Sequence, residues 1–135
     1  MRPSKATPTL DDPPTGVLAV DDRQTFREAV RRLVAATPGM VVIGEAASGE
    51  QAVELVEELK PDLVLMDVRM PGIGGVSATR RIKEAHPSVV VALISTINPE
   101  ELPSVADECS ADALIWKRDL QPHVLSELWR RHRAA

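Results

Sequence analysis

The sequence predicts an α/β protein: a three-layer, doubly wound sheet of five parallel strands with helices on both faces. Aliphatic runs such as VLAV, LVLM and VVVALI recur along the chain. Strands that are apolar throughout are typical of a parallel sheet covered on both faces. Segments with apolar residues at helical spacing separate these runs, as repeated βα units require. Polar residues follow the runs, which is where open α/β sheets bind their ligands.

The composition restricts the possible functions. A chain of 135 residues with 44% hydrophobic and 27% charged residues is sufficient for one globular domain. The net charge of −4 argues against direct nucleic-acid binding by this chain. No apolar run is long enough to span a membrane, and no apolar stretch near the N-terminus is typical of a signal peptide. The lone Cys109, without a disulfide partner, is expected in the core, and we expect a cytoplasmic protein.

Residues 1–61 predict an arm, two strands and two helices. Residues 1–15 contain four prolines and no periodicity, so we expect a disordered arm before a domain at 16–133. Strands are expected at 17–20 and 41–46. Ser48 starts the second helix with Gln51 as its capping partner, and Lys60-Pro61 ends it. The expected apolar faces are Phe26, Ala29, Val30, Leu33 and Val34 on the first helix, and Ala52, Leu55, Val56 and Leu59 on the second.

The remaining elements continue the alternation. Strands are expected at 63–66, 89–94 and 113–116, with a helix at about 76–85. Helical spacing in the next segment includes Pro103, and an interior proline costs about 3 kcal/mol in a helix. The fourth helix is therefore short, kinked or begins at this proline. The last helix starts near Pro122 and is expected to bury Val124, Leu125, Leu128 and Trp129.

Five polar residues stand directly after the aliphatic runs: Asp21, Asp22, Asp67, Ser95 and Lys117. Alone, the acidic residues are common helix caps, the serine a common strand terminus and the lysine a common surface residue. Together, at one edge of a parallel sheet, three carboxylates cannot all stay ionised without compensation. A hard cation with oxygen ligands, Mg²⁺, provides it. A carboxylate beside a cation, a hydroxyl and an ammonium can receive a phosphoryl group.

Two residues, Val68 and Arg69, separate Asp67 from the turn-forming segment MPGIGG at positions 70–75. Its glycines, Gly72, Gly74 and Gly75, permit dihedral angles that other residues disfavour. They also let backbone groups come close to a ligand. The turn therefore favours a binding role for this strand end over a simple cap.

The succession DD, DVRMPGIGG, IST and WK resembles the receiver domain of bacterial two-component response regulators, from Gly16 to His132. The resemblance implies a flavodoxin-like sheet of order 2-1-3-4-5. It implies that Asp67 is the phosphoacceptor and that Ser95 and Lys117 bind the phosphoryl oxygens. It further implies a Mg²⁺ site made by Asp21, Asp22, Asp67 and the backbone carbonyl of Arg69.

Three positions depart from the family pattern. Leu114 stands where relatives usually have an aromatic residue whose rotamer reports phosphorylation, and Arg118 stands where many have proline. Pro103 lies in the helix that normally transmits the signal. The side chain of Arg69, two residues after the acceptor, is expected in solvent, although it could also pair with the phosphoryl group.

The function expected from this resemblance is a free-standing, phosphorylation-controlled signalling receiver, not an enzyme beyond its own phosphorylation and dephosphorylation. Its expected partners are a histidine kinase or phosphotransfer protein and a downstream protein target. The face around the fourth and fifth helices is the candidate surface for a homodimer. Two alternatives stay open: an interaction module independent of phosphorylation, and the regulatory half of a DNA-binding response regulator. An aspartyl phosphohydrolase is disfavoured, because it would need Asp-x-Asp on the first strand.

Overall fold

The computed structural model describes residues 13–102 and 104–133. Across these residues five strands form one parallel sheet with the order β2-β1-β3-β4-β5, as predicted. The strands are β1 (Thr15–Val20), β2 (Met40–Ala46), β3 (Leu63–Asp67), β4 (Val90–Ser95) and β5 (Ala113–Trp116). The α-helices are α1 (Gln24–Ala35), α2 (Gly49–Leu59), α3 (Gly74–Ala85), α4 (Val105–Cys109) and α5 (Pro122–Arg133). Two 3₁₀ turns, Pro99–Glu101 and Lys117–Asp119, precede α4 and α5.

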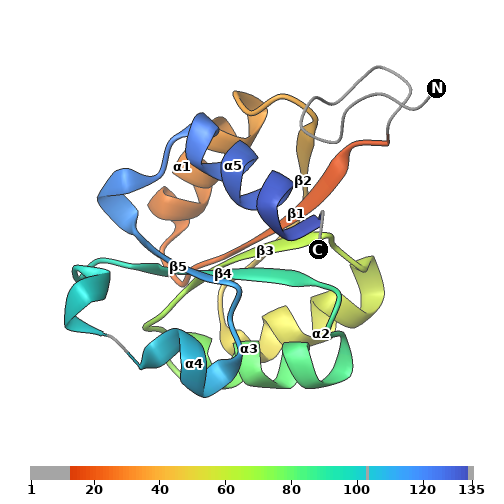
Figure 1. The fold of residues 1–135 in the computed structure, drawn as a ribbon. Coiled ribbons are helices and arrows are strands. Elements are labelled where there is room, and N and C mark those ends of the chain that lie inside the picture. The colour runs from red at the N-terminus through yellow and green to blue at the C-terminus, as the bar shows by residue number, and fades with distance from the viewer. Residues whose placement is uncertain (1–12, 103, 134–135) are drawn as a thin grey trace.

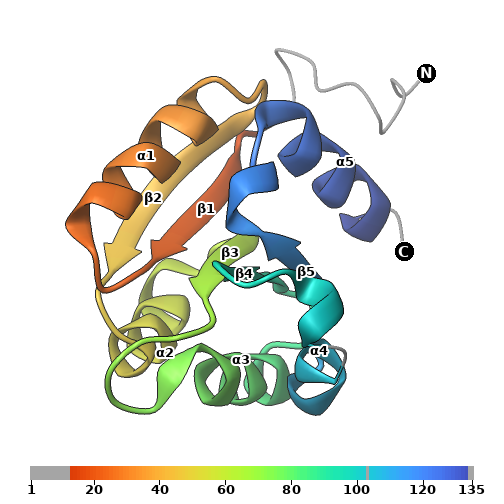
Figure 2. The same cartoon turned by 90° about the vertical axis from the view of Figure 1, so that its left-hand side faces the viewer.

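The helices cover the two faces of the sheet unequally. Figure 1 shows α1 and α5 on one face and α2, α3 and α4 on the other, and the turned view in Figure 2 shows the same three layers. Side chains alternate along each strand. Val17 and Ala19 of β1 therefore face α1 and α5, while Leu18 and Val20 face the other three helices.

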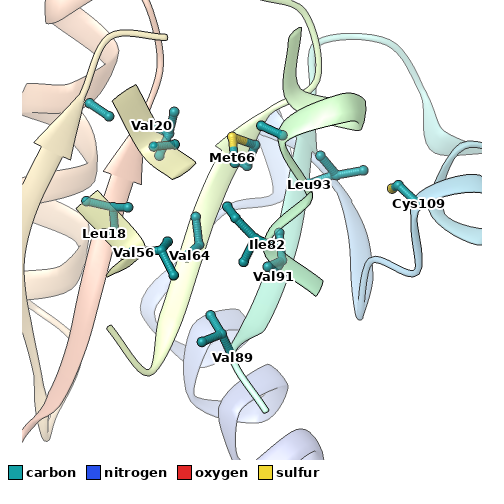
Figure 3. Close-up of a cluster of buried hydrophobic side chains, with 13 residues drawn as sticks. Leu18, Val20, Val56, Val64, Met66, Ile82, Val89, Val91, Leu93 and Cys109 are labelled. Carbon is teal, nitrogen blue, oxygen red and sulfur yellow. The ribbon is translucent and has the colours of Figure 1, made fainter. Parts of the chain in front are cut away.

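Both cores are almost entirely aliphatic. Figure 3 shows the cluster under α2, α3 and α4, in which Leu18, Val64 and Ile82 meet from three elements. Cys109 lies at the edge of this cluster, buried on α4 as predicted, and its thiol donates a hydrogen bond to the Val105 carbonyl at 3.3 Å. None of the helices in the described part of the chain is long and apolar enough to cross a membrane.

Helix ends follow local chemistry. The Ser48 hydroxyl accepts a hydrogen bond from the Gln51 amide at 3.1 Å, as predicted, but the Gln51 side chain accepts from the Ala47 amide rather than from that of Ser48. The helix stops at Lys60, which adopts a left-handed conformation (φ 49°) before the proline. Leu59, expected on the apolar face, is the last residue of α2, and it lies against Gly44 of the edge strand β2 while remaining 38% exposed.

The fourth helix is short, one of the three outcomes predicted for it. It has a single stretch of five residues, Val105–Cys109. Pro103 lies outside the described residues. In α5, Leu125 and Leu128 are buried, but Val124 and Trp129 are only half-buried because they flank the contact line with the sheet. The strand β1 begins at Thr15, one residue before the expected domain start, and residues 1–12 of the expected arm lie outside the described part.

Candidate functional site

Three carboxylates meet at the carboxyl edge of the sheet. Asp21 follows β1 and Asp67 ends β3, and these strands are paired in parallel with Val20 beside Met66. One carboxylate oxygen of each of Asp21, Asp22 and Asp67 lies within 4.8 Å of the others. Asp21 is 1% exposed and Asp67 5%, whereas Asp22 is exposed to solvent. The sequence prediction that these residues converge is confirmed.

The carboxylate of Asp21 is held by two cations and a backbone amide. Its Oδ1 accepts a hydrogen bond from the Arg23 amide at 2.8 Å, and the Arg23 Nε lies 3.6 Å away. Its Oδ2 lies 3.3 Å from the Lys117 Nζ. The Arg27 guanidinium donates to the Asp21 backbone carbonyl at 2.7 Å. A buried anion is thus compensated on both oxygens.

Asp67 has a different environment. Burial raises the pKa of its carboxyl group from 3.8 to about 6, and the nearby charge of Asp21 adds to this. The positive charges of Lys117 and Arg23 offset only part of the increase in pKa. No hydrogen bond to the Asp67 side chain occurs within residues 13–102 and 104–133. The carboxylate therefore has unused acceptor capacity that faces the other two acids.

Lys117 is fixed in place by an aromatic ring. Its ammonium lies 3.7 Å from the centre of the Phe26 ring on α1, and its side chain is only 18% exposed. A cation held over a ring face and bonded to a carboxylate has little freedom. The lysine predicted from the end of β5 therefore reaches the acidic residues from across β3 and β4.

Ser95, the last residue of β4, is buried at 3% exposure. Its hydroxyl donates to the Ile97 carbonyl at 2.8 Å and accepts from the Ile97 amide at 3.0 Å. The side chain stands at the predicted edge, but its single proton is engaged with its own loop. This arrangement is a local turn of the kind that serine hydroxyls favour.

The loop after β3 approaches the backbone of the acceptor strand closely. Gly75 donates its amide to the Val68 carbonyl at 3.1 Å, and a Cβ on Gly75 would come within 1.9 Å of the Asp67 carbonyl oxygen. Gly72 and Gly74 have positive φ angles of 81° and 76°, as the sequence predicted for this turn. Gly75 is needed for space and not for its dihedral angles. The side chain of Arg69 is exposed and forms no ion pair with any residue that the structure describes.

Residues 17–128 match the family model of the response regulator receiver domain. The chain belongs to this family. Receiver domains of two-component systems are phosphoacceptors, and they bind Mg²⁺ at an acidic pocket. The family's sheet order is the one observed here.

Curated relatives agree with this assignment. The response regulator GacA of Pseudomonas viridiflava is 43% identical over 88 residues, which are 65% of this chain and 41% of that protein. The nitrate/nitrite response regulator protein NarL of Escherichia coli (strain K12) is 37% identical over 112 residues, or 83% of this chain and 51% of that protein. The chain thus spans about half the length of these relatives or less.

Solved receiver structures have the same fold. The signal receiver domain of a NarL response regulator from Mycobacterium tuberculosis has a TM-score of 0.81 at 26% identity, covering 92% of this chain and all of that one (100%). The response regulator domain of Thermotoga maritima CheB has a TM-score of 0.78 at 28% identity, covering 89% and 97%. The expected flavodoxin-like receiver fold is confirmed.

The donor set of this receiver domain fits a hard divalent cation. Three carboxylates supply only oxygen atoms, the ligands that Mg²⁺ prefers, and two of them are buried close together. Lys117 and Arg23 provide some of the compensating charge, yet the pKa of Asp67 stays high. A dication beside Asp67 would stabilise its ionised form.

Sequence reasoning did not identify three residues at the site. Arg23 follows the acidic pair directly, and its charge lowers the pKa of Asp67. Phe26 was assigned only to the apolar face of α1, although it is the sole phenylalanine of the chain. Trp116, next to Lys117, donates its indole N–H to the Thr96 carbonyl at 3.3 Å. The signal available in the sequence was that aromatic residues are rare in this chain and that these two stand close to cationic residues, Phe26 three positions after Arg23 and Trp116 next to Lys117.

Proposed function

We propose that this chain is a phosphorylation-controlled signalling receiver that accepts a phosphoryl group on Asp67 in a Mg²⁺-dependent reaction and then changes its protein contacts. One observation carries the proposal. The Asp67 carboxylate, which is desolvated and accepts no hydrogen bond from the described residues, lies close to two further carboxylates and a lysine. In a receiver domain this convergence supports acyl phosphate formation over a purely structural role.

In this proposal Asp67 is the nucleophile. One carboxylate oxygen forms a bond to phosphorus, the bond between phosphorus and the donor atom breaks, and its electron pair leaves with the donor. The reaction needs little covalent machinery beyond in-line placement and charge stabilisation. The metal would be held by Asp21, Asp22, Asp67 and the backbone carbonyl of Arg69. When bound, Mg²⁺ supplies positive charge that stabilises the anionic carboxylate and phosphoryl oxygens.

Lys117 and Ser95 have the binding roles. The ammonium, already 3.3 Å from Asp21 and held by Phe26, is placed to stabilise negative charge on the phosphoryl oxygens. The Ser95 hydroxyl would donate to a phosphoryl oxygen after leaving the Ile97 carbonyl. The exposed Arg69 side chain would stay in solvent.

The partners follow from this role. A histidine kinase or a phosphotransfer protein would supply the phosphoryl group, and a protein would receive the signal. We propose no catalysis beyond the chain's own phosphorylation and dephosphorylation, and no direct nucleic-acid contact, given the net charge of −4. The α4–α5 side is the proposed homodimer surface. A cytoplasmic location is part of the proposal, since one cysteine allows no internal disulfide.

The test uses a small-molecule phosphodonor, acetyl phosphate, with Mg²⁺ or with a chelator, and follows the intact mass of the protein. We expect one added phosphoryl group with Mg²⁺ and none with the chelator. The label should survive acid and be lost in base, as an acyl phosphate is. No label under either condition would reject the proposal and favour an interaction module that does not depend on phosphorylation.

A further inference from the structure

Trp116 stands between the lysine of the site and the loop that follows Ser95. It is the last residue of β5, and it pairs in register with Ser95 on β4. Leu114 packs into the cluster under α2, α3 and α4, and Trp116, two residues further along the strand, points to the same side of the sheet. The indole N–H donates to the Thr96 carbonyl at 3.3 Å.

A second contact holds the indole ring in place. The guanidinium carbon of Arg118 lies 4.1 Å from the centre of the Trp116 ring. Such a cation over the ring face restrains the side chain even though both residues are accessible to solvent. The ring is therefore held where its N–H can donate a hydrogen bond to the carbonyl of Thr96, one residue beyond Ser95.

The loop has two incompatible hydrogen-bond arrangements. The Ser95 hydroxyl carries one proton, which it now gives to the Ile97 carbonyl at 2.8 Å. If that proton goes to a phosphoryl oxygen on Asp67, the turn from Ser95 to Ile97 loses one of the two bonds that close it, and only the bond from the Ile97 amide to the hydroxyl, now 3.0 Å long, can remain. Thr96 lies inside this weakened turn, and in the proposed change its carbonyl reorients and leaves the Trp116 indole.

We infer that Trp116 is a positioning residue that holds the turn at residues 95–97 in its unphosphorylated conformation through the indole hydrogen bond to Thr96. The inference rests on the proposed function of Asp67 and Ser95. Leu114, at the position where relatives usually have an aromatic residue, has no polar group with which to sense the loop. In this chain Trp116, which precedes Lys117 and lies on the same face of β5 as Leu114, takes the role of coupling the loop to phosphorylation.

The size of the effect follows from the geometry. An intramolecular hydrogen bond contributes about 0.5–1.5 kcal/mol, and a long, solvent-accessible one lies at the low end. Removing the indole N–H should therefore ease the loop change and raise the affinity for a phosphoryl mimic by about two- to threefold. A residue that only supported the fold would lower this affinity or leave it unchanged.

The experiment compares the same substitution, tryptophan to phenylalanine, at two positions. Trp116→Phe keeps an aromatic ring against Arg118 but removes the N–H. Trp129→Phe is the matched control, because the Trp129 indole nitrogen is buried without a hydrogen-bond partner in the described part of the chain. Both variants and the wild type are titrated with beryllium fluoride in the presence of Mg²⁺, and the two indole resonances of the wild type are followed by nitrogen–proton correlation spectra.

The expected result has two parts. Beryllium fluoride should shift the Trp116 indole resonance much more than that of Trp129, and Trp116→Phe alone should bind the mimic more tightly. Equal affinities for all three proteins together with an unmoved Trp116 resonance would overturn the inference while leaving the proposed function intact. Failure of the wild type to bind the mimic at all would instead count against the proposed function.

Discussion

Replacing Asp67 with asparagine should make the protein more stable at neutral pH. The substitution keeps the shape of the side chain and removes the charge. The wild-type carboxyl group has a pKa of about 6 in the folded state against 3.8 for an ordinary aspartate, chiefly because it is buried. Its ionised form is therefore disfavoured by folding, and a neutral amide escapes that cost.

The direction and size of the pH dependence follow from this difference. Between pH 3.8 and about 6 the folded wild type retains a proton that the unfolded chain has lost, so its stability falls as the pH rises through this window. At about 1.4 kcal/mol per pKa unit the full cost is about 3 kcal/mol, reached above the folded pKa. At about pH 4.5 only about 1 kcal/mol of it remains.

The assay is urea unfolding of wild type and Asp67→Asn at about pH 7.5 and about pH 4.5, in chelator so that no divalent cation offsets the charge. We expect the variant to be more stable by about 3 kcal/mol at the higher pH and by about 1 kcal/mol at the lower. Asp22→Asn serves as the control, since this exposed side chain should give a much smaller gain. If the variant is no more stable than the wild type at either pH, then burial does not destabilise the ionised Asp67 carboxylate in the folded state, and the reasoning is refuted.

Three further substitutions test the site. Asp22→Asn should weaken Mg²⁺ binding on the order of tenfold by calorimetry, because it removes one of three clustered charges, and an unchanged affinity would exclude Asp22 from the metal site. Gly75→Ala should lower the free energy of unfolding by at least about 2 kcal/mol, because the new Cβ would collide with the Asp67 carbonyl; wild-type stability would show that the loop adapts freely. Phe26→Leu should slow phosphorylation about fivefold by releasing Lys117, and an unaltered rate would leave the ring a packing role alone.

The fold and the positions of the site residues were accessible from the sequence because they depend on the strand pattern. Aliphatic runs located every strand to within a residue or two, and parallel strands bring their carboxyl ends to one edge. The meeting of Asp21 with Asp67 on adjacent strands follows from this pattern. So does the arrival of Lys117 from β5.

The details that depend on side-chain direction were not accessible. The Ser95 hydroxyl turns to Ile97, a choice made by local hydrogen bonding that strand periodicity does not encode. Phe26 lies under the Lys117 ammonium because of where α1 crosses the strand ends. Leu59 lies on the predicted face, against Gly44 of β2, but helical periodicity does not show that the last residue of this face stays 38% exposed over the edge strand.

The most direct test of the central claim is to locate the phosphoryl group on the chain. Wild type and Asp67→Asn are treated with acetyl phosphate and Mg²⁺, digested under acidic conditions and mapped by mass spectrometry. We expect a base-labile phosphoryl group on Asp67 in the wild type and none anywhere in the variant. A base-labile label that persists in the variant at the wild-type level would contradict it.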